Sequence, residues 1–181
     1  EGGIAIKGLQ IDLSGSISDW SSDAPALDLN FATSSDQFGE LLKLIPEAYQ
    51  EQISEFDAGG SLSFSGSVKG KVAEDELPQL DAGLDVQNAF LQHPDLQERI
   101  SDIAIKAGIT NEEISLNRFE ASAGENTMNA NGAILKPLGD NPIAKLTAEA
   151  SMDLSTIPNY YPIDTDTLEA RGQLQASVTI D

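Results

Sequence analysis

Most of this chain alternates between an apolar and a polar residue, and this period of two constrains the fold more than any other feature. In the clearest stretch, apolar residues or glycine occupy the even positions from Leu62 to Val72, while Ser or Lys occupies the odd positions from Ser61 to Lys71. Successive side chains of a β-strand point to opposite faces, so such alternation indicates a half-buried strand. About ten such stretches with short turn-forming connections predict an antiparallel meander that has one apolar face. The apolar positions shift from even to odd between Leu116 and Phe119, which predicts a β-bulge there.

Two segments of the sequence resemble each other at a constant spacing. Ile45–Tyr49 (IPEAY) corresponds to Ile157–Tyr161 (IPNYY), and Gly60–Leu62 (GSL) corresponds to Gly172–Leu174 (GQL). Both matches are 112 residues apart, since 157 − 45 and 174 − 62 give the same offset. Self-similarity at a fixed offset indicates one structural unit that is used more than once.

The repeat sets the expected domain organisation. We expect residues 1–181 to form a single β-rich domain and to be a fragment of a larger repetitive protein. The first repeat unit is expected to cover about residues 27–143, and a second unit to begin at about residues 144–181.

One segment departs from the strand pattern and predicts a helical hairpin near residues 36–56. Asp36 is a favourable N-cap, and apolar residues follow it at helical spacing up to Ile45. Pro46 interrupts this helix and is suited to the first position of a second helix, which Gly59 and Gly60 follow. The second copy is seven residues shorter here, because Leu27 matches Leu146 at an offset of 119 rather than 112.

Composition and charge exclude several classes of function. The chain is 40% apolar and 22% charged, which is typical of a globular domain. It has no cysteine, so disulfides, Cys-based zinc sites and thiol catalysis are excluded. Its net charge of −20, from 30 acidic and 10 basic residues, argues against binding to nucleic acid, which requires Lys and Arg to neutralise phosphates.

Several segments carry a resemblance to a known family. In order, these are Leu44–Pro46, Gly60–Gly70 (Gly-x-Leu-x-x-x-Gly-x-Val-x-Gly), Pro78–Ala89 (Pro-x-Leu-x-Ala-x-Leu-x-Val-x-Asn-Ala), Ile100–Ile103 and Phe119–Gly124 (Phe-x-Ala-x-x-Gly). Together they resemble the C-terminal region of AsmA-like proteins, a bacterial envelope family that includes TamB-type relatives. The resemblance spans most of the chain, from about residue 27 to its end, and its motifs are small residues and aliphatics at set spacings.

The resemblance implies a location and a function. It implies a periplasmic segment of a Gram-negative envelope protein, whose parent is anchored in the inner membrane through parts outside this sequence. It also implies a non-enzymatic role in outer-membrane biogenesis, in which phospholipid moves between membranes along an apolar β-groove. The partners would be phospholipid acyl chains. The residues that we expect to contact lipid are Leu62, Phe64, Val68, Leu84, Val86, Leu174 and Val178.

The residues themselves leave two alternatives open. The apolar face forms either an open trough, which glycines within strands such as Gly66, Gly70 and Gly132 would help to bend, or the core of a sandwich. For a chain of this length we favour a packed core, since apolar stripes usually face a protein interior. The alternative function is a structural β-repeat module of a surface or adhesin-type protein, which acts as a spacer or interaction domain.

No residue is assigned to catalysis, to a cofactor or to a metal. His93 is the only histidine and precedes a proline in a polar segment, where we expect an exposed loop residue. The acidic runs 74–76 and 164–166 lack the spacing of a calcium loop, and we expect solvated loops there. Trp20 lies in a polar segment, where it is expected to cover a strand end. The sequence therefore predicts a protein that is not an enzyme.

Overall fold

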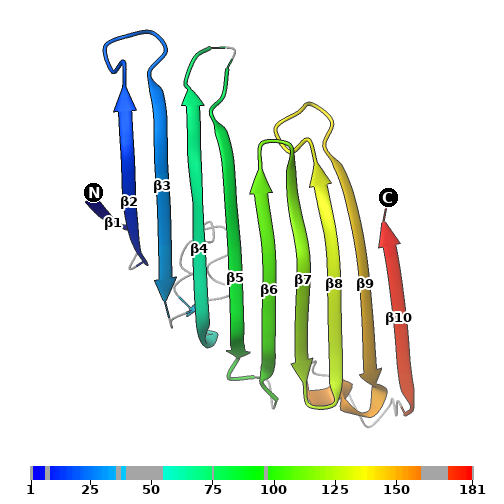
Figure 1. The fold of residues 1–181 in the computed structure, drawn as a ribbon. Coiled ribbons are helices and arrows are strands. Elements are labelled where there is room, and N and C mark those ends of the chain that lie inside the picture. The colour runs from blue at the N-terminus through cyan, green and yellow to red at the C-terminus, as the bar shows by residue number, and fades with distance from the viewer. Residues whose placement is uncertain are drawn as a thin grey trace.

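A single open sheet dominates the computed structural model of the chain, which describes residues 2–6, 9–35, 38–39, 55–74, 76–95, 98–159 and 171–180 (Figure 1). The sheet is antiparallel throughout, and each strand pairs with its neighbours in the sequence. The elements are β1 (Gly2–Ile6), β2 (Leu9–Ser18), β3 (Ala26–Ser35), β4 (Asp57–Lys71), β5 (Gln79–Gln92), β6 (Ile100–Thr110), β7 (Glu113–Ala123), β8 (Asn126–Leu135), β9 (Ile143–Asp153), the 3-10 helix η1 (Leu154–Asn159) and β10 (Gln173–Ile180).

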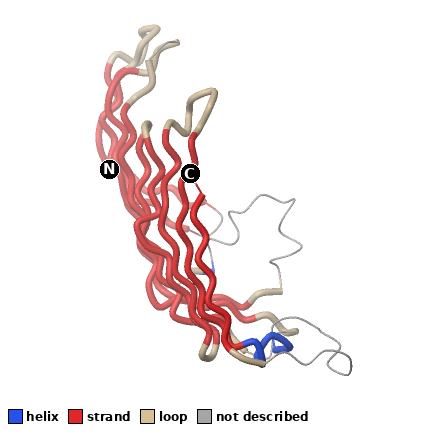
Figure 2. The backbone as a smooth tube through the Cα atoms, turned by 90° about the vertical axis from the view of Figure 1, so that its right-hand side faces the viewer, coloured by secondary structure: helices blue, strands red, loops and turns tan. Residues whose placement is uncertain are grey.

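The predicted antiparallel meander is confirmed. The ten strands follow one another across the sheet in sequence order, from β1 at one edge to β10 at the other. Within the described ranges there is no second sheet, so of the two arrangements left open by the sequence these strands form the open sheet and not a sandwich. Figure 2 shows that this sheet is bowed, and that η1 lies on the side toward which its lower end bends.

Cross-strand pairing gathers the apolar residues of successive strands on one side of the sheet. One row runs from β3 to β10 through directly paired residues: Thr33, Phe64, Leu84, Ala107, Leu116, Gly132, Leu146 and Ile180. The adjacent row is Ser35, Leu62, Val86, Ile105, Phe119, Ala130, Ala148 and Val178. We call this side the apolar face and the opposite side, which carries Ser61 to Lys71 at odd positions, the polar face.

Bulges keep the apolar residues on one side where the alternation shifts. The register changes between Leu116 and Phe119 in β7, as the offset of the apolar residues in this segment predicts. Further shifts lie between Val86 and Ala89 in β5, and between Ser101 and Ala104 in β6. Asn88 and Asp102, at these two shifts, have positive φ angles of 51° and 52°. Each bulge inserts an unpaired residue, so that the following side chain returns to the apolar face.

The packed core is one cluster toward one end of the apolar face. It contains five buried residues, namely Phe38, Leu62, Val86, Ala89 and Ile103. Phe38 precedes β4 in the chain and is held by a hydrogen bond in which its backbone N–H donates to the carbonyl oxygen of Gly60, at 2.9 Å. Gly60 has a φ of 122° and lies so close to Ala89 that a Cβ atom would overlap its backbone, so glycine is required there.

The predicted helical hairpin near residues 36–56 lies almost entirely outside the described residues. Only Phe38, Gly39, Glu55 and Phe56 of that segment are described. Gly59 and Gly60, which were expected to follow the second helix, lie within β4 and next to its register shift. In the second copy, η1 occupies the corresponding place between β9 and β10.

Candidate functional site

The apolar face is the candidate site, and all seven residues predicted to contact lipid lie on it. Register pairs Leu62 directly with Val86, Phe64 with Leu84, and Val68 with Leu80, so β4 and β5 bring the first five predicted residues together. Leu174 and Val178 lie on β10, where they pair with Met152 and Ala148 of β9. The seven residues therefore form two groups at different places on one face.

The two groups differ in their exposure to solvent. Leu62 is 2% exposed and Val86 is equally enclosed, and both belong to the buried cluster with Phe38, Ala89 and Ile103. Phe64, Val68 and Leu84 are half-buried. Leu174 is 48% exposed and Val178 is 53% exposed. Of these two groups, only the one on β10 presents about half of its aliphatic surface to solvent.

Further exposed aliphatic residues extend this surface across the sheet. Large hydrophobic side chains exposed on the apolar face are Ile17, Ile114, Met128, Ile134, Leu174, Val178 and Ile180, six of them on β7, β8 and β10. Alanines fill the positions between them, at Ala144, Ala148, Ala150 and Ala176. The result is a shallow surface of small and medium-sized aliphatic groups that spans four strands.

At one end of this surface, hydrogen bonds attach the start of η1 to β8 and β9. The side-chain carbonyl oxygen of Asn126, at the start of β8, accepts from the backbone N–H of Asp153 at 2.7 Å, and its amide donates to the hydroxyl of Thr156 at 2.8 Å. Asp153 in turn accepts from the backbone N–H of Ser155 at 2.9 Å and from its hydroxyl at 2.8 Å. These two hydrogen bonds lower the pKa of the Asp153 carboxyl below its ordinary value. The contacts hold η1 against the sheet.

The polar face carries hollows that are lined by charged and amide side chains. One of about 480 Å³ lies over β5 to β7, and Asp85, Lys106 and Arg118 are paired across it from strand to strand. Nη2 of Arg118 lies 2.6 Å from Oε2 of Glu120, and this hydrogen bond lowers the pKa of the Glu120 carboxyl. Arg118 and Glu120 are about half exposed, so water screens the pair. These hollows are wide and solvated, and they lack the apolar lining of a typical small-molecule pocket.

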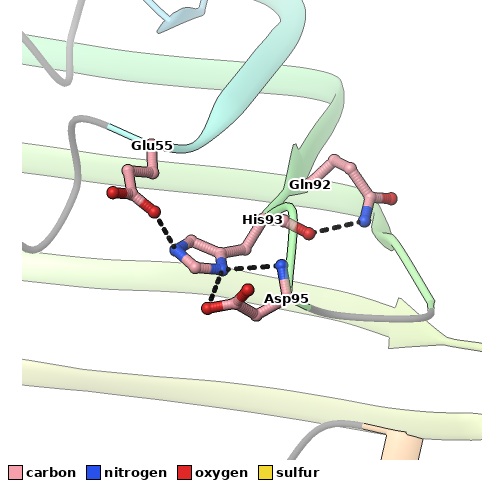
Figure 3. Close-up of polar contacts among 4 residues, drawn as sticks. All are labelled: Glu55, Gln92, His93 and Asp95. Carbon is pink, nitrogen blue, oxygen red and sulfur yellow. Dashed lines mark hydrogen bonds and ion pairs between the residues drawn. The ribbon is translucent and has the colours of Figure 1, made fainter.

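His93 lies in a polar cluster beside the end of β5 (Figure 3). Its Nε2 is 3.4 Å from Oε2 of Glu55, and its Nδ1 accepts a hydrogen bond from the backbone N–H of Asp95 at 3.2 Å. The ring of Phe56 packs on the imidazole with 4.9 Å between centroids. The side chain of His93 is only 19% exposed, so the expectation of an exposed loop residue is wrong. The cluster fastens the segment before β4 to the turn between β5 and β6.

Trp20 and the acidic runs are the remaining positions named from the sequence. Trp20, in the loop between β2 and β3, is 75% exposed, so it does not cover a strand end as expected. In the acidic run 74–76, Glu74 and Glu76 lie exposed in the turn after β4, while the run 164–166 lies outside the described residues. Over the described ranges there is no group of three His, Asp or Glu side chains that could hold a metal ion.

Comparisons with known proteins give no match. No protein-family model, no curated protein and no solved structure matches this chain. No helix within the described part of the chain is long and apolar enough to cross a membrane.

Sequence reasoning missed Asn126 and the contacts of His93. Asn126 lies on the apolar face of β8, a strand that otherwise alternates regularly. An asparagine at a position where the alternation calls for an apolar residue is the sequence signal that could have indicated a hydrogen-bonded side chain there. The contacts of His93 come from residues 38 positions apart, Glu55 and His93, which no local pattern connects.

Proposed function

We propose that this chain is a non-enzymatic segment of an AsmA-like envelope protein that takes part in outer-membrane biogenesis by offering an apolar track to phospholipid acyl chains. The observation that carries the proposal is the exposed aliphatic surface of β7 to β10, which includes Leu174 and Val178. Water-exposed aliphatic groups that are continuous across strands are typical of a surface with an apolar ligand or partner.

The dimensions of the surface suit an acyl chain. β9 has 11 residues, which at about 3.3 Å per residue gives a length of about 36 Å. The acyl chains of one lipid leaflet span about 15 Å, half of a hydrocarbon core of about 30 Å. An acyl chain would therefore fit lengthwise along the strands. The location that we propose is the periplasm of a Gram-negative bacterium.

A second function is favoured by a different observation. The cluster around Phe38 closes part of the apolar face as an ordinary core does. A structural β-repeat module, which serves as a spacer in a surface or adhesin-type protein, would need only such packing and no ligand. The two functions differ in whether the surface of β7 to β10 binds lipid.

Phospholipid that co-purifies from bacteria distinguishes the two functions. Leu174→Glu and Gln173→Glu are a matched pair, because both sites are exposed on β10 and both substitutions add one negative charge, but the side chains lie on opposite faces. We expect Leu174→Glu to reduce bound phospholipid about tenfold, since a lost apolar side-chain contact costs about 1.5 kcal/mol or more. Gln173→Glu should leave it unchanged. Native mass spectrometry measures both, and a lipid-free wild-type protein that binds no lipophilic dye would favour the spacer.

A further inference from the structure

Within the described residues, the outer edge of β10 pairs with no strand and lacks the features that usually protect such an edge. Among the described strands, β10 pairs only with β9, so its other side presents backbone N–H and carbonyl groups. Natural edge strands are commonly protected by lysine, proline, a bulge or very short length. β10 has eight residues (QLQASVTI), none of them charged and none proline, and every one is exposed. Its register with β9 is also free of bulges.

The internal repeat relates β10 to a strand whose second neighbour is known. At the offset of 112 the residues of β10 correspond in sequence to residues of β4. The corresponding pairs are Leu174 and Leu62, Ala176 and Phe64, Val178 and Gly66, and Ile180 and Val68. In Figure 1, β3 and β9 run downward and β4 and β10 run upward, so β3 and β9 end, and β4 and β10 begin, at the lower end of the sheet. β4 binds β3 on one edge and β5 on the other. The outer edge of β10 therefore corresponds to the edge of β4 that binds β5.

We propose that this edge binds an extended polypeptide segment with the pattern of β5, which has an aliphatic residue at every second position, in the register that β5 takes on β4. On β4, Leu62 pairs with Val86, Phe64 with Leu84, and Gly66 with Ala82. With the offset of 112, the residue of the added strand that is equivalent to Val86 would lie opposite Leu174. The equivalents of Leu84 and Ala82 would lie opposite Ala176 and Val178.

The side chains of β10 suit these neighbours. The small Ala176 would lie opposite the large Leu84, and the larger Val178 would lie opposite the small Ala82, so bulk alternates along the pair. The apolar residues of the added strand would join the apolar face, and its polar residues would join the polar face. Main-chain hydrogen bonds would supply affinity, as in other cases of strand addition to a sheet edge.

The probe is a capped, fluorescently labelled peptide with the sequence of residues 79–87 (QLDAGLDVQ), titrated with the full 181-residue chain. We expect saturable binding that Val178→Lys weakens at least tenfold, because a charge on the apolar side of an edge strand opposes pairing. Thr179→Lys adds the same charge on the polar face and should change binding less than twofold. Both sites are exposed, and circular dichroism checks that both variants fold.

Disulfide coupling tests the register, since the chain has no cysteine of its own. A peptide with Leu84→Cys should couple to Ala176→Cys at least fivefold faster than to Val178→Cys, because directly paired Cβ atoms lie within disulfide reach and diagonal ones lie farther apart. Equal coupling rates, equal effects of the two lysine variants, or no binding at millimolar peptide would overturn the proposal. Self-association that Val178→Lys abolishes, without peptide binding, would assign the edge to a second copy instead. None of these readouts depends on lipid.

Discussion

Leu62 in β4 and Leu174 in β10 occupy matched positions of the repeat, yet they lie in opposite environments. Both are on the apolar face, and their strands begin at the same end of the sheet and run in the same direction (Figure 1). Leu62 is enclosed and Leu174 is about half exposed. Strand pattern therefore determines which face a side chain joins, but it does not determine whether that face is covered.

The difference has two physical causes. Leu62 has a paired strand on each side, and Phe38 packs in the same cluster. Leu174 has a described strand on one side only, where it pairs with Met152. The connections also differ, because the first places an aromatic ring on the sheet, whereas the second is held by the hydrogen bonds of Asn126 and Asp153.

The difference between the two environments is tested most strongly by truncating the side chains of both leucines to alanine. Leu62→Ala should lower the free energy of unfolding by about 2–4 kcal/mol, because it leaves a cavity in the buried cluster. Leu174→Ala should lower the free energy of unfolding by less than about 1 kcal/mol, since the Leu174 side chain is about half exposed in the folded protein. Urea denaturation measures both values. Equal losses would mean that the apolar face near β10 is packed as tightly as the core.

Asn126 tests whether the second connection depends on polar contacts. Asn126→Ala should lower the free energy of unfolding by about 1–3 kcal/mol, because it removes the acceptor for the backbone N–H of Asp153 and the donor to the hydroxyl of Thr156. Asn129→Ala, on the exposed polar face of the same strand, should change stability by less than about 0.5 kcal/mol. Thermal unfolding compares the two variants, and an equal effect would contradict a holding role for Asn126.

The smallest expected effect is a local pH dependence at η1. Hydrogen bonds from Ser155 lower the pKa of Asp153 in the folded state, so their stabilising contribution is present above the ordinary value of 3.8 and is lost as pH falls through the lower folded value. The amide resonance of Ser155 should titrate with an apparent pKa below 3.8 in NMR spectra. In Asp153→Asn this titration should vanish. A titration at or above 3.8 would exclude the capping interaction.

Local pattern was sufficient for the strands, their faces and one bulge. The alternation from Leu62 to Val72 predicted β4, and the offset between Leu116 and Phe119 predicted the register shift in β7. These features depend on neighbouring residues and on the period of a β-strand, so a single sequence contains them. The seven predicted lipid contacts share one face for the same reason, while their contact with lipid stays a prediction.

Local pattern could not predict which parts of the apolar face are enclosed. The packed core that we favoured is limited to the cluster around Phe38, while the aliphatic surface of β7 to β10 is exposed. The environment of His93 was missed because Glu55 and Phe56 reach it from a distant part of the chain. Such contacts depend on where connections cross the sheet, and no periodicity of a strand encodes that.

By itself, the sequence determined an antiparallel sheet with one apolar and one polar face, since alternation with a period of two assigns every side chain to a side. Only the tertiary structure decided that the described strands stay in a single open sheet, that Leu62 joins the buried cluster around Phe38, and that Leu174 remains exposed on a strand with one described neighbour. The physical reason is that burial depends on what lies across a face and beside a strand. Those neighbours come from residues far apart in the chain.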